Sequence, residues 1–202
     1  MRLGIFGGTF NPPHLGHLVC AQEAYLQLGL DRVMLIPARI PPHKAVGDEP
    51  GAEHRLELCR RAVDGDERFT VSDLEMRRDG PSYTVDTLEE LHSQDPDTEM
   101  FLIVGGDVAA GLPRWHEPER VLSLATPAIA KRRGTRRPAI EAALGTLRGG
   151  ERACFFRMPS ISFSSTMVRD RVRSGQSIRY IVPDGVASYI NENGLYGGRT
   201  RT

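Results

Sequence analysis

Short apolar runs alternate with amphipathic stretches along most of the chain. Six of the apolar runs have the composition of buried β-strands: Leu3–Phe6, Val33–Ile36, Phe69–Val71, Met100–Val104, Pro127–Ala130 and Ala153–Phe156. Three stretches between them carry apolar residues at helical spacing, about from Leu15 to Leu28, from Glu53 to Val63 and from Thr84 to His92. Strands that alternate with helices predict an α/β fold, with a doubly wound parallel sheet and helices on both faces.

The end of the chain predicts a small C-terminal helical part over about residues 164–196. Residues 184–190 have a helical pattern, and Asn193-Gly194 closes it. The chain contains no internal repeat and no low-complexity tract, so we expect a single domain over residues 1–196. Residues 197–202 are expected to be a frayed, disordered tail.

The composition is that of an ordinary globular protein, with 40% hydrophobic and 26% charged residues. A chain of 202 residues can bury a sizeable core without disulfides or a structural metal. Cys20, Cys59 and Cys154 form no Cys-x-x-Cys pair, which favours buried, reduced thiols in a cytoplasmic protein. No apolar run has the length of a transmembrane helix, and the N-terminus turns to glycine too soon for a signal peptide.

The formal net charge is zero, from 26 basic and 26 acidic residues, which argues against a generic nucleic-acid binder. The two halves differ, however. Residues 1–100 hold 10 basic and 18 acidic residues, a net of −8, and residues 101–202 hold 16 and 8, a net of +8. Of the 26 basic residues, 24 are Arg, which suits bidentate contacts to phosphate or carboxylate.

Doubly wound sheets bind ligands at the carboxyl ends of their strands, so the segments after the predicted strands are the informative ones. The first predicted strand runs into Gly7-Gly8-Thr9-Phe10, and His14 and His17 follow at the start of a helix. Glycine lets the backbone approach a ligand closely, and a helix start attracts phosphate. Two histidines three positions apart share one face of a helix and could donate hydrogen bonds to a phosphate.

Other interpretations of this segment are weaker. It matches neither the dinucleotide fingerprint nor the P-loop pattern. A zinc site that uses His14 and His17 has no third ligand at a recognisable spacing. One surface histidine and one packed histidine would be a common outcome for His-x-x-His alone, but the preceding Gly-Gly-Thr-Phe argues against it.

A second candidate phosphate site lies at Ser164-Ser165-Thr166, where hydroxyl residues open a helical pattern. Arg169 is one turn further on and could place its guanidinium on the same phosphate. A plain capped helix with a surface arginine is the alternative for this segment alone.

The two motifs together resemble a known family. His14-Leu15-Gly16-His17 is similar to the His-x-Gly-His signature of nucleotidyltransferases, and residues 7–17 as a whole resemble the bacterial nicotinate-nucleotide adenylyltransferases. Residues 164–169 are similar to the family's second signature, in the family's order. Asn11 and Pro13 stand where the family usually has Asp and Ile.

The resemblance implies a Rossmann-like fold and a set of site residues. The residues implied to surround the triphosphate as catalytic groups are His14, His17, Lys44 and Arg169. The residues implied to bind ATP are Gly7, Gly8, Thr9, Phe10, Gly105, Asp107, Ser164, Ser165 and Thr166. Those implied to bind nicotinate mononucleotide are Tyr83, Thr84, Trp115, Arg132 and Arg133. The loop after the fifth strand lacks the family's Arg-Pro-Gly, and its arginines would otherwise be a solvated face.

The implied activity joins nicotinate mononucleotide to AMP from ATP and releases pyrophosphate. The attacking phosphate is already anionic, so positioning and charge stabilisation suffice without a general base. The expected cofactor is Mg²⁺ carried by the ATP phosphates, with no protein metal site. The expected partners are the two substrates, with no nucleic acid and no membrane, and the enzyme would be a monomer or a homodimer.

Four alternatives remain at this point. Nicotinamide mononucleotide could replace the nicotinate form, because a few donors around one carboxylate decide between them. A phosphopantetheine adenylyltransferase shares His-x-Gly-His but lacks the Ser-Tyr-Thr and Pro-Arg-Trp-His segments seen here. A nucleotide-binding module without catalysis would not need the histidines, and an NAD-dependent oxidoreductase would need the absent glycine fingerprint.

Overall fold

The computed structural model describes residues 1–42, 50–131 and 136–197. Its centre is a six-stranded parallel sheet with the strand order β3-β2-β1-β4-β5-β6. The strands are β1 (Arg2–Gly8), β2 (Arg32–Pro37), β3 (Phe69–Val71), β4 (Glu99–Gly105), β5 (Ala125–Lys131) and β6 (Cys154–Arg157). This order is that of a Rossmann-like sheet, and the direction of winding reverses between β1 and β4. The predicted fold class is confirmed.

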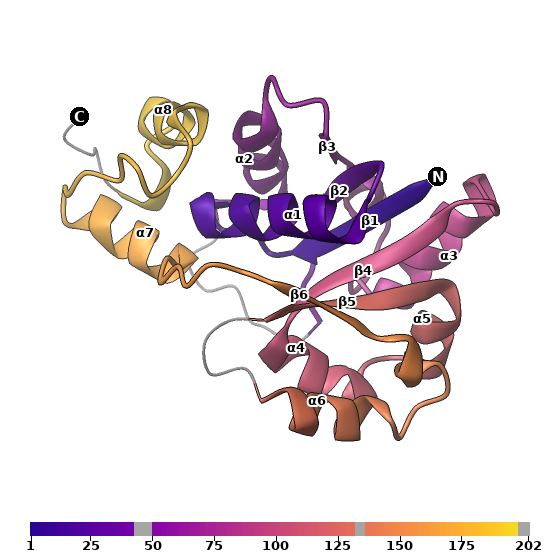
Figure 1. The fold of residues 1–202 in the computed structure, drawn as a ribbon. Helices are drawn as coiled ribbons and strands as arrows, with labels where there is room; N and C mark the ends of the chain where they lie inside the picture. Colours follow the sequence, from indigo (N-terminus) through magenta and orange to yellow (C-terminus); the bar gives the residue numbers. More distant parts are fainter. Residues whose placement is uncertain (43–49, 132–135, 198–202) are drawn as a thin grey trace.

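The helices of the described residues connect these strands and then continue beyond the sheet (Figure 1). They are α1 (Leu15–Leu28), α2 (Ala52–Val63), α3 (Thr84–Gln94), α4 (Gly106–Gly111), α5 (Pro118–Leu124), α6 (Arg137–Leu144), α7 (Ser165–Arg173) and α8 (Asp184–Glu192). Short 3-10 turns add Leu74–Met76, Leu112–Arg114, Gly150–Arg152 and Leu195–Gly197. Among the described residues, no helix is long and apolar enough to cross a membrane.

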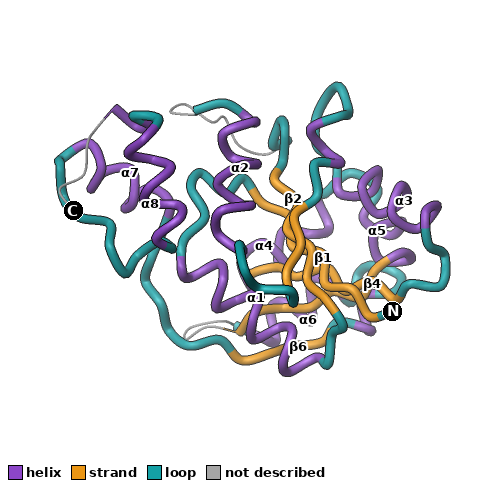
Figure 2. Tube along the Cα trace, turned by 90° about the horizontal axis from the view of Figure 1, so that it is seen from above, coloured by secondary structure: helices purple, strands orange, loops and turns teal. Residues whose placement is uncertain are grey.

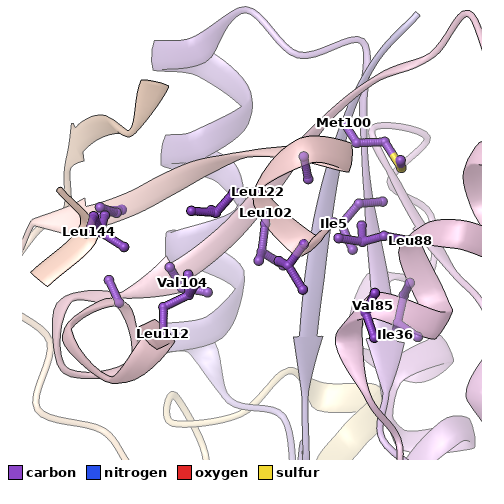
Figure 3. Close-up of a cluster of buried hydrophobic side chains, with 14 of the residues drawn as sticks. Ile5, Ile36, Val85, Leu88, Met100, Leu102, Val104, Leu112, Leu122 and Leu144 are labelled. Atoms are coloured by element: carbon purple, nitrogen blue, oxygen red, sulfur yellow. The ribbon is translucent and has the colours of Figure 1, made fainter. Parts of the chain in front are cut away.

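Both faces of the sheet are covered because successive residues of a strand point to opposite sides. Met100, Leu102 and Val104 of β4 pack toward α3, α4, α5 and α6, in the cluster drawn in Figure 3. Phe101 and Ile103 of the same strand pack on the other face, toward α1 and α2. Strands buried on both faces explain why the sequence shows continuous apolar runs rather than strict alternation.

A third cluster joins the C-terminal helices to the body of the molecule. Leu58 and Ala62 of α2 pack with Val168 and Val172 of α7 and with buried residues of α8. Figures 1 and 2 show α7 and α8 beyond one end of the sheet, beside α2. The prediction of a helical part near residues 164–196 agrees with these two helices, and residues 198–202 of the predicted tail lie outside the described residues.

The three cysteines have free thiols, as predicted. Cys20 and Cys59 are buried, and burial raises the pKa of the Cys59 thiol far above its ordinary value. The prediction of burial is wrong for Cys154, which lies on the edge strand β6 and is only partly buried.

Candidate active site

The first motif forms the turn from β1 into α1, at the carboxyl end of the sheet. His14 is the residue just before the helix, in an extended conformation, and His17 lies in the first turn. Their rings stack with centroids 3.8 Å apart and planes 27° apart. The backbone N–H of His14 donates to Nδ1 of His17 at 3.2 Å. The structure therefore brings the two predicted histidines together, with His14 capping the helix rather than lying inside it.

This hydrogen bond sets the chemistry of the His17 ring. Because Nδ1 accepts this hydrogen bond, a neutral His17 carries its proton on Nε2. Nε2 is then a hydrogen-bond donor, and a phosphate oxygen can accept from it. The ring of Phe10 packs edge-on against His17 at 5.1 Å, so Phe10 supports the histidine from the core.

Gly16 is required by the packing of His14. A Cβ built at Gly16 would lie 3.0 Å from Cε1 and Nδ1 of the His14 ring. Such a contact is closer than a side chain normally tolerates, so the ring would have to move. The glycine between the two histidines thus keeps the stacked pair in place.

The second motif lies against the first although about 150 residues separate them in the sequence. Ser164 caps α7 by accepting from the backbone N–H of Met167 at 3.1 Å. The hydroxyl of Ser165 donates to the Pro12 carbonyl at 2.8 Å. Arg169 donates from Nη1 to the Asn11 carbonyl at 2.8 Å and from Nη2 to Thr166 Oγ1 at 3.3 Å. The start of α7 and the turn before α1 are one unit.

One side-chain donor of Arg169 is not used by the described residues. Its Nε is buried and has no hydrogen-bond partner within the described part of the chain. A buried polar atom without a partner is costly, and a bound anion would supply an acceptor. This arrangement suits the phosphate contact that the sequence predicted for Arg169.

A cavity of about 330 Å³ opens beside this unit, a volume suited to a small ligand. Seven of the predicted substrate-binding residues line it: Gly7, Gly8, Thr9, Tyr83, Thr84, Gly105 and Trp115. Most of its exposed wall is apolar, with Ile5, Val104 and Val108 among the lining residues. His14, His17 and Arg169 are not among the lining residues, but Gly7, Gly8 and Thr9 of the wall lead directly into the turn that carries the two histidines.

Other predicted residues have separate positions. Asp107 lies exposed in the first turn of α4, directly after β4. Lys44, Arg132 and Arg133 lie outside the described residues. Among the described residues, no group of three or more His, Cys, Asp or Glu side chains could hold a metal ion.

Glu75 is a residue of this cavity that the sequence analysis missed. It is buried, lines the cavity, and accepts a hydrogen bond from Thr87 Oγ1 at 2.8 Å. Burial raises the pKa of the Glu75 carboxyl, against the hydrogen bonds from Thr87 and Ser82 and the charge of Arg78, which lower it. Ser82 in turn accepts from the backbone N–H of Arg39 at 3.0 Å. Glu75 thus ties the start of α3 to the segment after β2.

Arg55 is the second residue that the sequence analysis missed. Its side chain is 0% exposed on α2 and donates to the backbone carbonyls of Thr9 at 2.9 Å, Ala38 at 2.5 Å and Arg39 at 3.0 Å. These carbonyls follow β1 and β2, so one guanidinium holds two loops of the site. A signal existed, because Arg55 occupies the apolar face of the helix, four residues before buried Cys59.

Comparisons of the sequence with known proteins give consistent relatives over nearly the whole chain. Residues 5–171 match the family model of cytidylyltransferase-like proteins. A probable nicotinate-nucleotide adenylyltransferase of Geobacillus thermodenitrificans is 42% identical over 203 residues, which covers 98% of this chain and 88% of that protein. The nicotinate-nucleotide adenylyltransferase of Bacillus subtilis is 39% identical and covers 96% of this chain and 98% of its own length.

Solved structures are similar as well. The nicotinic acid mononucleotide adenylyltransferase of Plasmodium falciparum, complexed with NaAD, superposes with a TM-score of 0.78 over 98% of both chains. At 18% sequence identity, this similarity shows the shared fold. It independently supports the doubly wound sheet.

Proposed function

This chain belongs to the nicotinate-nucleotide adenylyltransferase family, and we propose from its site how it performs that family's reaction. The enzyme transfers AMP from ATP to nicotinate mononucleotide, which gives nicotinate adenine dinucleotide and pyrophosphate, a step in NAD biosynthesis. The observation that supports our assignment of roles is that Arg169 of α7 binds the turn that carries the stacked His14 and His17, beside a cavity that can accept a ring.

In the proposed mechanism, the 5′-phosphate of the mononucleotide attacks the α-phosphorus of ATP in line, and pyrophosphate leaves. The nucleophile is an anion, so no residue has to remove a proton. His17 donates from Nε2, and Arg169 and the start of α7 add donors, to the charge that grows on the phosphates. His14 contributes by stacking on His17 and fixing its orientation. Lys44 is proposed to approach the triphosphate from the segment after β2.

The mononucleotide ring is proposed to occupy the cavity. Trp115 and Tyr83 line it and offer aromatic surfaces for stacking. Helix α3 begins at this wall with Thr84, and the N–H groups of a helix start favour an anion such as the nicotinate carboxylate. Asp86 in the same turn works against an anion, so the preference for the acid depends on how closely the carboxylate approaches Thr84.

We propose that Mg²⁺ enters the site on the ATP phosphates and neutralises part of their charge. Phosphate oxygens are good ligands for this ion, which usually keeps several water ligands when bound to nucleotides. The enzyme is also proposed to act in the cytoplasm, where its three free thiols would stay reduced.

The test of the proposed function is release of pyrophosphate by the purified protein with ATP, Mg²⁺ and nicotinate mononucleotide. We expect release that depends on the mononucleotide and matches the dinucleotide formed. Binding of both ligands without release would support a non-catalytic nucleotide-binding module instead. Release without an acceptor would indicate ATP hydrolysis and would also contradict the proposal.

A further inference from the structure

The last turn of the described chain reaches back to the first motif. Tyr196 lies in the Leu195–Gly197 turn after α8, and its hydroxyl donates to Oδ1 of Asn11 at 2.8 Å. The two residues are 185 positions apart. Tyr196 belongs to the Asn-Gly-Leu-Tyr segment of the C-terminus, to which the mechanism above assigns no task.

Asn11 is held from two directions. Its backbone carbonyl accepts from Arg169, and its side chain accepts from Tyr196. Asn11 is 5% exposed, and a polar side chain buried to this extent needs partners. The hydroxyl of Tyr196 therefore holds the Asn11 side chain, and Arg169 holds the Asn11 backbone.

The backbone at both ends of this contact is unusual. Phe10, next to Asn11, has a φ of 47°, and Tyr196 has a φ of 63°. Residues other than glycine seldom adopt this left-handed conformation, and it persists where the surrounding structure enforces it. Such conformations gather at functional sites, which agrees with the place of Asn11 in the turn that leads into His14.

We propose that Tyr196 is a positioning residue for adenylyl transfer, which holds Asn11 and thereby the turn that carries the stacked histidines. The proposal rests on the function proposed above. Movement of this turn would displace His14, His17 and the Arg169 contact together. The cavity wall formed by Tyr83 and Trp115 comes from other elements, so binding of the mononucleotide ring would change little.

Tyr196→Phe tests the proposal, because it removes one hydroxyl and keeps the ring. The structure offers a matched control in Tyr189→Phe. The Tyr189 hydroxyl hydrogen-bonds Nδ1 of His54 at 3.0 Å, so it also ties the C-terminal helices to the body, but at α2. Steady-state kinetics and melting temperature are measured for both variants and the wild type.

We expect Tyr196→Phe to lower kcat about tenfold, the size of one lost hydrogen bond that acts through position. Its KM for nicotinate mononucleotide should stay within about twofold. Tyr189→Phe should keep kcat, although both variants lose similar thermal stability. A Tyr196→Phe enzyme with the wild-type kcat would overturn the proposal, and so would equal losses of kcat in both variants.

A double-mutant cycle with Asn11→Ala makes the test specific to the contact. Asn11→Ala removes the side-chain acceptor and keeps the carbonyl that accepts from Arg169. In the Asn11→Ala background, Tyr196→Phe should reduce kcat no further. A double variant whose loss of kcat equals the product of the two single losses would contradict the proposal. If the wild type forms no dinucleotide, the proposed function fails and takes this inference with it. If the wild type is active and Tyr196→Phe is equally active, this inference fails alone.

Discussion

His14 and His17 are not equivalent groups in this structure, although the sequence motif presents them as a pair. His14 is 6% exposed and lies between Gly16 and the His17 ring. His17 accepts at Nδ1 and is oriented to donate from Nε2. At the scale of single residues, we therefore propose His17 as the principal donor to the reacting phosphates, with His14 keeping its ring in place.

The substitution His17→Ala should lower kcat by a factor on the order of 10² to 10³, the usual loss for one donor to transition-state charge. His17→Gln should recover part of this loss, because its amide nitrogen can take a position near that of Nε2. Turnover of the purified variants measures both effects. His92→Ala, in the last turn of α3, is the control and should keep its activity. Near-wild-type turnover of His17→Ala would remove His17 from the mechanism.

The substitution Glu75→Gln should change how the free energy of unfolding depends on pH. The pKa of Glu75 is raised in the folded protein, above its ordinary value of 4.5, chiefly by burial. As pH rises above 4.5, the carboxyl ionises first in the unfolded chain. The wild type therefore loses free energy of folding until the pH passes the raised pKa of the folded state. Glutamine does not titrate, and the variant avoids this loss.

The expected result is that Glu75→Gln gains stability relative to the wild type as pH rises from 5 toward 8. Urea unfolding of both proteins at several pH values measures the difference. If the difference in unfolding free energy between the two proteins is constant, or grows toward acid pH, the Glu75 carboxyl does not cause the pH dependence.

At the scale of elements, the carboxyl ends of β1 and β2 are held together by α2 through Arg55. Removal of this side chain would leave three partly buried carbonyls without their charged donor. Arg55→Met should therefore cost about 3 kcal/mol or more of folding free energy. Arg60→Met is the control on the same helix, because its exposed ion pair with Glu57 should contribute less than about 1 kcal/mol. Denaturant unfolding measures the loss of folding free energy in each variant. Equal losses in Arg55→Met and Arg60→Met would contradict the role of Arg55 in holding the two strand ends.

The sequence was sufficient for the main elements and insufficient for the connections between them. Apolar runs predicted all six strands, and helical spacing predicted α1 from Leu15 to Leu28 as observed. Helices α4, α5 and α6 were not predicted, because six to eight residues carry too little periodicity to recognise. Arg55 and Glu75 were missed for a different reason. The carbonyls that Arg55 binds follow two different strands, and the burial of Glu75 beside the cavity exists only in the folded chain.

At the scale of the whole molecule, the opposite charges of the two halves do not map onto the site. The acidic half supplies His14 and His17, and the basic half supplies Arg169 and α7. The two halves meet at the turn before α1, where Arg169 and Tyr196 both bind Asn11. The local arrangement of donors, rather than net charge, makes this region suitable for anionic substrates.

The most direct test of this account compares two acceptors with the same enzyme preparation. Dinucleotide formation is measured with ATP and Mg²⁺ and with either nicotinate or nicotinamide mononucleotide. A pocket that hydrogen-bonds the ring carboxylate should favour the nicotinate form by at least about tenfold in kcat/KM. Equal rates, or faster reaction with the nicotinamide form, would contradict the account of the cavity and of its start-of-helix donors at Thr84.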